Sequence, residues 1–165
     1  MRNVLLSAAT ALFALVALVV VASSPEPGSD GYAPPLRPGV TDLGFERLAD
    51  FDYGDVLPRT TGHIPSRVRE LDGQRVRIVG HVFPMATREG DPEMVFALSR
   101  TSPDCCFGRM PAINEWVLVR APRNAKLPDD PRIKAWVTGT LDVGETRDAE
   151  GVVLSIYALD AEAVE

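Results

Sequence analysis

Hydrophobic and polar residues alternate along the second half of the chain, and a period of two is typical of half-buried β-strands. In residues 75–83, Val76 and Ile78 face one side while Arg75 and Arg77 face the other. Four further runs have strand-like apolar patterns with turn residues between them. The pattern therefore predicts a mostly β fold. The five expected strands cover residues 75–83, 94–99, 115–119, 133–143 and 151–159.

Two glycines interrupt the apolar faces of these runs and predict how the strands curl. Gly80 and Gly139 lie inside the first and fourth strands, where glycine favours a bulge or a sharp bend. The turn at 144–151 joins the last two strands as a hairpin. Strands that bend in this way favour a small five-stranded OB-like barrel, with a small open sandwich as the alternative.

Short helical elements are expected before the first of these strands. Pro65 suits the first turn of a helix that continues to Glu70. Residues 42–55 carry spaced apolar side chains and are interpreted either as one amphipathic helical turn or as a lid against the domain. The sequence does not decide between these two.

The chain begins with the basic residue Arg2 and an uncharged apolar run from Val4 to Ala22, a pattern typical of an export signal. About 20 apolar residues span a bilayer, whereas the apolar region of a cleaved signal has about 7–15. Two alternatives follow. The segment is a single-pass anchor that holds the protein on the extracytoplasmic side of the bacterial inner membrane, or cleavage near Ala22 gives a secreted or periplasmic protein. With Arg2 on the cytoplasmic side, the body lies outside in both cases.

Proline recurs between this segment and the predicted domain, which excludes helix and central strand there. The sequence therefore divides into three parts. These are a membrane anchor or signal peptide at 1–22, a Pro-rich disordered tether at 23–41 and an OB-like β-barrel domain at 42–165.

Charge and motifs narrow the functional classes. The formal net charge is −6 at pH 7, and the acidic residues are scattered along the chain. Nucleic acids and anionic lipids are bound chiefly through basic surfaces, so neither is expected as a partner, and contact with the membrane is expected only through the N-terminal segment. Hydrolase and phosphate-binding motifs are missing from the sequence, so no catalytic residue is predicted and a non-enzymatic role is favoured.

Cys105 and Cys106 are the only cysteines, and they are adjacent. Consecutive Cα atoms lie about 3.8 Å apart, whereas disulfides usually need about 4.4–6.8 Å, so a bond between these two would be strained. Two free thiols would instead suit copper(I) or zinc. As a third alternative, the side chains pack as small hydrophobic groups. The sequence leaves all three open.

Other residues that could bind a metal give a weaker signal. The two histidines, His63 and His81, do not have zinc-finger spacing to each other or to the cysteines. His81 is expected on the polar face of its strand, either exposed or hydrogen-bonded. With Met110, these histidines are the weak candidate ligands for copper or zinc, and no cofactor is the default expectation. Met85, Met94 and Met110 are expected to fill the core.

Trp136 and Asn114 are candidates for a binding surface. Trp136 faces outward in its strand, where it either marks a contact surface or is covered by residues 42–55. Asn114 is expected to hold the cysteine loop through side-chain hydrogen bonds to the backbone. An oligosaccharide-binding barrel is a further alternative and would use Trp116 and Trp136 for stacking.

Several motifs together resemble those of the bacterial family called domain of unknown function 3299. The resemblance covers about residues 60–160, and the Cys-Cys-Phe-Gly and Asn-Glu-Trp motifs are its most specific part. It implies an exported protein, often anchored or lipidated, and no activity. The lipid-attachment cysteine of some relatives is absent here. The matching segments are Ile64-Pro65, Val68 to Met85, Cys105-Cys106-Phe107-Gly108, Pro111, Asn114-Glu115-Trp116-Val117, Gly139-Thr140-Leu141 and Ser155-Ile156-Tyr157.

These inferences favour a non-enzymatic extracytoplasmic binding or accessory module of the bacterial cell envelope. Its barrel would contact a protein partner, and the loop with Cys105 and Cys106 would be structural or part of the contact surface. The alternative is a metal-handling protein, for copper or zinc, or a redox protein that uses the two cysteines.

Overall fold

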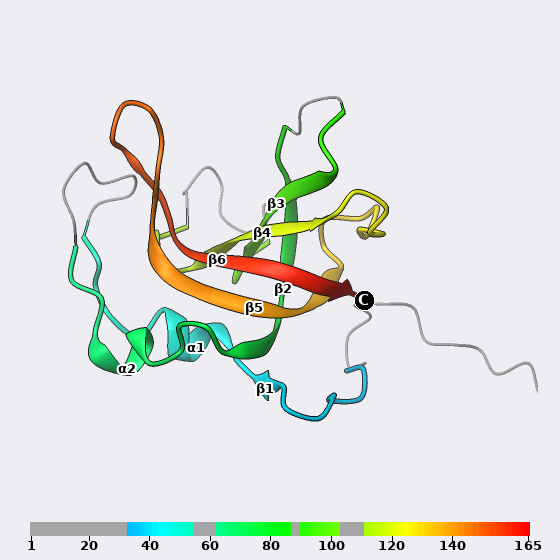
Figure 1. Cartoon of the computed structure of the whole chain (residues 1–165), viewed down its shortest axis with the longest axis horizontal. Coiled ribbons are helices and arrows are strands. Elements are labelled where there is room, and N and C mark those ends of the chain that lie inside the picture. The colour runs from blue at the N-terminus through cyan, green and yellow to red at the C-terminus, as the bar shows by residue number, and fades with distance from the viewer. Residues whose placement is uncertain (1–32, 55–61, 87–89, 103–110) are drawn as a thin grey trace, which may run out of the picture.

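The computed structural model describes residues 33–54, 62–86, 90–102 and 111–165, and these residues are mostly β (Figure 1). The predicted helix that follows Pro65 is present as α2, and the five predicted strands are present, with one short strand before them that the sequence did not predict. The elements are, in chain order, β1 (Thr41–Asp42), α1 (Phe45–Leu48), α2 (Ser66–Arg69), β2 (Arg75–Pro84), β3 (Glu93–Ser99), β4 (Trp116–Pro122), β5 (Lys134–Arg147) and β6 (Val153–Val164).

The strands form one six-stranded sheet that closes on itself. Its order is β1-β2-β3-β4-β6-β5, and β2 also pairs with β5, so the five long strands make a ring of hydrogen-bonded neighbours. Within this ring only β4 and β6 run parallel, and the other pairs are antiparallel. The predicted hairpin is confirmed as β5–β6, which curves across the other strands in Figure 1.

Gly80 lies where β2 changes its partner. β2 pairs with β5 along Arg75–His81 and with β3 along His81–Pro84. A Cβ added to Gly80 would lie 2.7 Å from the carbonyl oxygen of Ser99, closer than real Cβ atoms come to a backbone atom. The strand can therefore turn from one neighbour to the next only because this position has no side chain.

Gly139 lies at a bulge between β5 and β6. The register of this pair shifts between Thr138 and Gly139, so that Glu162 of β6 is skipped. A Cβ on Gly139 would lie 2.2 Å from the carbonyl oxygen of Asp160. The irregularity predicted at Gly139 is therefore confirmed, and the physical reason is the close approach of two backbones.

The core lies inside the ring. In β2, β3, β4 and β5 it is built from alternate residues, as the period of two requires, whereas β6 is buried on both faces from Ser155 to Leu159. Large side chains with no exposed surface come from all five ring strands. They include Val76, Ile78, Phe96, Leu98, Val117, Val119, Val137, Leu141, Ile156 and Leu159.

Residues 42–54 pack onto this ring. Two alternatives were predicted for this segment, a helical turn and a lid against the domain, and the segment has features of both. α1 is a single helical turn, and its side chains Phe45 and Leu48 are buried in the core. The hydroxyl of Tyr157, a fully buried residue of β6, donates a hydrogen bond of 2.8 Å to the carbonyl oxygen of Leu48. The helical turn is therefore also a cover held by a buried hydrogen bond.

Arg77 is buried, although the alternation assigned it to a polar, outward face. Its side chain is only 6% exposed and donates hydrogen bonds of 2.6 and 2.8 Å to the carboxylate of Asp42. It also donates to the carbonyl oxygen of Pro34, and its guanidinium lies 4.6 Å from the centre of a Trp136 ring. Trp136 is therefore covered by Arg77, with Asp42 of the segment 42–55 bound to that arginine.

Residues 33–41, which the sequence assigned to the tether, lie against the domain. Val40 is 7% exposed, Pro34 is buried, and Thr41 pairs with Val76 of β2. The packed part of the chain therefore begins before residue 42, and the guanidinium of Arg77 bonds to both ends of this segment, at Pro34 and Asp42.

Among the residues that the structure describes, no helix has the length and apolar character needed to cross a membrane. The anchor or signal predicted at 1–22 lies outside the described residues, as do tether residues 23–32.

Tyr157→Phe is expected to make stability less sensitive to alkaline pH. Burial raises the pKa of Tyr157 above the value of about 10 that it has in an unfolded chain. A raised folded-state pKa contributes stability that is fully present below about pH 10 and is lost as pH rises through the folded-state pKa. The variant should lose about 1 kcal/mol at pH 7, for the missing hydrogen bond to Leu48, and should decline less above pH 10.

Urea unfolding of both proteins from pH 7 to pH 11.5 would measure this difference. Parallel declines above pH 10 would show that Tyr157 ionises equally in the folded and unfolded states. Tyr53→Phe is a useful second variant, because the pKa of Tyr53 is also raised. Burial is the main cause, and a hydrogen bond with Glu145 is the second.

Candidate functional site

The segment that carries the two cysteines leaves and rejoins the sheet at neighbouring points. β3 ends at Ser99 and β4 begins at Trp116, and these two residues pair across the strands. Residues 100–115 therefore form an excursion whose two ends are side by side. Cys105, Cys106 and Met110 lie in this excursion but outside the described residues, so the hypotheses about them remain predictions.

Glu115 closes the base of the excursion with both its backbone and its carboxylate. The N–H of Arg100 donates to the Glu115 carbonyl at 3.0 Å, and the N–H of Glu115 donates to the Ala112 carbonyl at 2.8 Å. Glu115 Oε2 accepts from the N–H of Ala112 at 3.0 Å, and Oε1 lies 3.6 Å from Arg100 Nη1. Sequence analysis did not select Glu115 as a site residue, and its only signal was its place in the Asn-Glu-Trp motif.

Asn114 joins this base to the segment after α1. Its side chain is almost entirely buried, and Nδ2 donates to the carbonyl oxygens of Ala49 at 3.4 Å and Phe51 at 2.5 Å. The predicted hydrogen bonds from this side chain to backbone are therefore present, but they reach residues 49–51. Carbonyl oxygens accept hydrogen bonds, so the NH2 group of the carboxamide must face Ala49 and Phe51. Oδ1 therefore faces away from these two residues.

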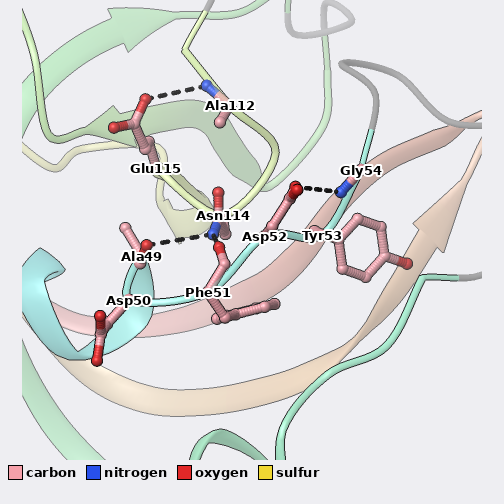
Figure 2. A pocket seen from close by; sticks show the side chains of 9 residues that line it. All are labelled: Ala49, Asp50, Phe51, Asp52, Tyr53, Gly54, Ala112, Asn114 and Glu115. Atoms are coloured by element: carbon pink, nitrogen blue, oxygen red, sulfur yellow. Dashed lines mark hydrogen bonds between the residues drawn. The ribbon is translucent and has the colours of Figure 1, made fainter.

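A pocket of about 390 Å³ lies between these two parts of the chain (Figure 2). One wall comes from residues 49–54, and the other comes from the end of the cysteine-bearing excursion. Among the residues that the structure describes, no lysine, arginine or histidine lines it. The lining residues are Ala49, Asp50, Phe51, Asp52, Tyr53, Gly54, Ala112, Asn114 and Glu115.

Hydrogen bonds hold the 49–54 wall in place. Asp52 Oδ1 accepts from the N–H of Gly54 at 2.9 Å, which is a tight local turn. The edge of one aromatic ring faces the other in the pair Phe51–Tyr53, with centroids 6.5 Å apart and planes at 75°. The Tyr53 hydroxyl bonds to the carboxylate of Glu145 in β5, and its pKa is raised by burial and by this bond. The wall is therefore tied to the β5–β6 hairpin.

The two histidines lie in different surroundings. His63 is exposed and precedes α2. His81 is 9% exposed in β2, with Nδ1 3.1 Å from the carbonyl oxygen of Pro131, so it is the hydrogen-bonded alternative that is observed. Within the described ranges, no group of three or more histidine, cysteine, aspartate or glutamate residues could hold a metal ion.

The remaining aromatic and sulfur-containing candidates are mostly packed. Trp116 lies against the core, and its Nε1 is buried without a hydrogen-bond partner among the described residues. Trp136 carries the guanidinium of Arg77 over its ring, which leaves less of that ring for stacking on a sugar. Met94 packs against the core, whereas Met85 is 41% exposed at the end of β2, so its predicted core position is wrong.

These features define a mostly β protein whose ring of strands carries a pocket beside the β3–β4 excursion. The family model described as "Protein of unknown function (DUF3299)" matches residues 58–165, and the chain belongs to this family. The family predicted from the motifs is therefore confirmed.

A solved structure shows the same fold. The crystal structure of a DUF3299 family protein from Pseudomonas aeruginosa PAO1 has a TM-score of 0.53 and 17% sequence identity to this chain. The match covers 74% of this chain and 93% of that chain. A comparison with curated proteins gave no match.

Proposed function

We propose that this protein is a non-enzymatic binding or accessory module on the extracytoplasmic side of the bacterial cell envelope. Its contact surface would combine the cysteine-bearing excursion with the pocket beside it. The observation that carries the proposal is the pocket of about 390 Å³, whose two walls are held together by the buried side chain of Asn114. A volume of this size is in the range of small-ligand and side-chain pockets.

The arrangement of the strands supports this proposal. The ring order β2-β3-β4-β6-β5, with β4 and β6 parallel, is the order expected of an OB-like barrel. Barrels of that kind bind oligonucleotides and oligosaccharides on the face of their second and third strands. In this ring those strands are β3 and β4, and the cysteine-bearing excursion connects them.

The N-terminal sequence supports the location. A basic first turn and an uncharged apolar run from Val4 to Ala22 would place the domain outside the cytoplasm, whether or not cleavage occurs near Ala22. The scattered acidic residues and the net charge of −6 favour a protein partner in the envelope over a nucleic acid.

A second candidate function rests on the cysteines themselves. Cys105 and Cys106 have no other cysteine in the chain to pair with, so their adjacency suits either a strained disulfide or a soft metal such as copper(I) or zinc. On this alternative the protein would handle metal or react in redox exchange, and the base closed by Glu115 would present the thiols.

The proposed function predicts a partner that contacts the pocket. A photoreactive benzoylphenylalanine in place of Asp52, in the full-length chain in its native envelope, should give one dominant cross-linked protein. The same substitution at Asp129, an exposed residue that does not line the pocket, should not give it. Mass spectrometry would identify the product and map the linked peptide.

The same preparation distinguishes the two candidate functions. Metal analysis and thiol titration should find no stoichiometric metal if the module only binds a partner. Copper or zinc at one equivalent, lost in both Cys105→Ser and Cys106→Ser, together with no cross-link from residue 52, would overturn the proposal in favour of metal handling.

A further inference from the structure

The pocket offers hydrogen-bond acceptors from its side chains, and its side-chain donors are already used. Asn114 Nδ2 donates to two backbone carbonyls, and the Tyr53 hydroxyl is bound to Glu145. The remaining polar side chains of the lining are the carboxylates of Asp50, Asp52 and Glu115. A ligand that complements this lining must therefore bring donors.

Asn114 adds an acceptor that does not depend on the acidic residues. The residue is 3% exposed, and its orientation is fixed by its two bonds to the carbonyl oxygens of Ala49 and Phe51. Its Oδ1 accepts no hydrogen bond from any residue in the described ranges. Figure 2 shows Oδ1 on the side of the carboxamide away from Ala49 and Phe51. A buried side chain thus presents one unused carbonyl oxygen to the pocket that it lines.

The charge of the lining favours a cation. Arg67 and Arg100 lie near two of the carboxylates, at 3.7 Å from Asp50 and 3.6 Å from Glu115, and both distances are too long for hydrogen bonds. Both arginine side chains are at least half exposed, so neither fills the pocket. Asp52 is bound only to the N–H of Gly54 among the described residues.

Phe51 is also among the lining residues, but its ring packs against the core, and Figure 2 shows that ring on the side of the 49–54 segment away from Asn114. The groups that would hold a cation are therefore the polar ones.

We propose that this pocket binds a lysine or arginine side chain of a polypeptide partner. Asn114 Oδ1 and the carboxylate of Asp52 would accept its N–H groups. The inference rests on the proposed binding function and specifies the part of the partner that enters the pocket.

Three blocked tripeptides test the inference on the full-length protein in detergent. They are acetyl-Gly-Lys-Gly-amide, acetyl-Gly-Arg-Gly-amide and the uncharged acetyl-Gly-norleucine-Gly-amide, titrated by NMR. Both cationic peptides should shift the backbone signals of residues 49–54 and 112–115, and should bind about tenfold more tightly than the norleucine peptide. Added salt should weaken their binding.

Asp52→Asn gives the decisive variant. It keeps an oxygen for the N–H of Gly54 and removes only the charge, and it should weaken binding of the cationic peptides about fivefold. Asp129→Asn removes an exposed carboxylate outside the pocket and should leave binding unchanged.

The outcomes separate this inference from the proposed function. Equal binding of the norleucine peptide, an equal loss in both variants, or no binding of either cationic peptide would overturn the cation site. If a partner is still cross-linked from residue 52, the proposed function stands without it. If cationic peptides bind as expected and no partner is cross-linked, the site stands and the proposed function fails.

Discussion

Gly139→Ala should lower the free energy of unfolding by about 3 kcal/mol, the upper part of the usual range for overpacking. The added Cβ would lie 2.2 Å from the carbonyl oxygen of Asp160 and 3.0 Å from the Cα of Ala161. Both are backbone atoms of β6, so no side-chain rotation can relieve the contact. The two strands would have to separate at the bulge where Glu162 is skipped. Chemical denaturation followed by circular dichroism would measure the loss.

Gly144→Ala is the matched control in the same strand. Its added Cβ would meet only the Asp142 side chain, at 3.8 Å, which is ordinary van der Waals contact. Its stability should stay within about 0.5 kcal/mol of the original protein. Equal stability of the two variants would mean that β5 and β6 do not approach closely at Gly139.

Asp42→Ala should cost about 2–3 kcal/mol, because it removes both carboxylate bonds from the buried guanidinium of Arg77. Asp42 itself is half exposed, so the loss comes from the arginine left behind rather than from the carboxylate. β1 should also loosen, since it pairs with β2 only through Thr41 and Asp42. The N–H of Leu43, which donates to the carbonyl oxygen of Arg77, should then exchange its hydrogen faster than in the original protein, a change that hydrogen-exchange mass spectrometry detects.

A second substitution tests the cause of this loss. Arg77→Met in the Asp42→Ala background replaces the unpaired charge by an apolar side chain of similar length. The double variant should therefore be more stable than Asp42→Ala alone, because an apolar side chain carries no desolvation penalty. Additive losses from the two substitutions would contradict a buried, partnered guanidinium.

The ring strands could be predicted from the sequence because their pattern is local. Val76 and Ile78 alternate with polar residues, and both are fully buried in β2. Gly80 and Gly139 interrupt their strands where the backbones of neighbouring strands approach, so a missing side chain was itself the signal. Local patterns of this kind survive in a single sequence because each residue's neighbours along the chain determine its face.

What covers the outer face of the ring could not be predicted in the same way. Alternation places Arg77 and His81 away from the core, and it does so correctly. It does not reveal that residues 33–42 pack over Arg77, or that the carbonyl of Pro131 reaches His81. Both side chains are buried by segments that are remote in sequence and have no periodic pattern.

The pocket was beyond sequence reasoning for a related cause. Its two walls meet through hydrogen bonds from the Asn114 side chain to the backbone carbonyls of Ala49 and Phe51. Every residue type has such a carbonyl, so the sequence does not indicate which carbonyls accept these bonds. Asn114 was identified through its motif, and its backbone bonding was predicted, but its partners were not. Glu115 lies in the same motif and closes the excursion with four contacts, which only the structure shows.

The closed ring also has a consequence for the order of events during folding. The pair that closes the ring, β2 with β5, joins Arg75 to Thr140, and the parallel pair, β4 with β6, joins Leu118 to Ala158. β2 and β4 therefore pair with strands that are synthesised much later. Chains dominated by such distant pairings fold in milliseconds to seconds rather than microseconds. During synthesis, β2 is the first ring strand to emerge, and it is complete only after β5 has been made. The order of synthesis and the order of assembly therefore differ in this protein, and β2 is the strand that stays incompletely paired for longest.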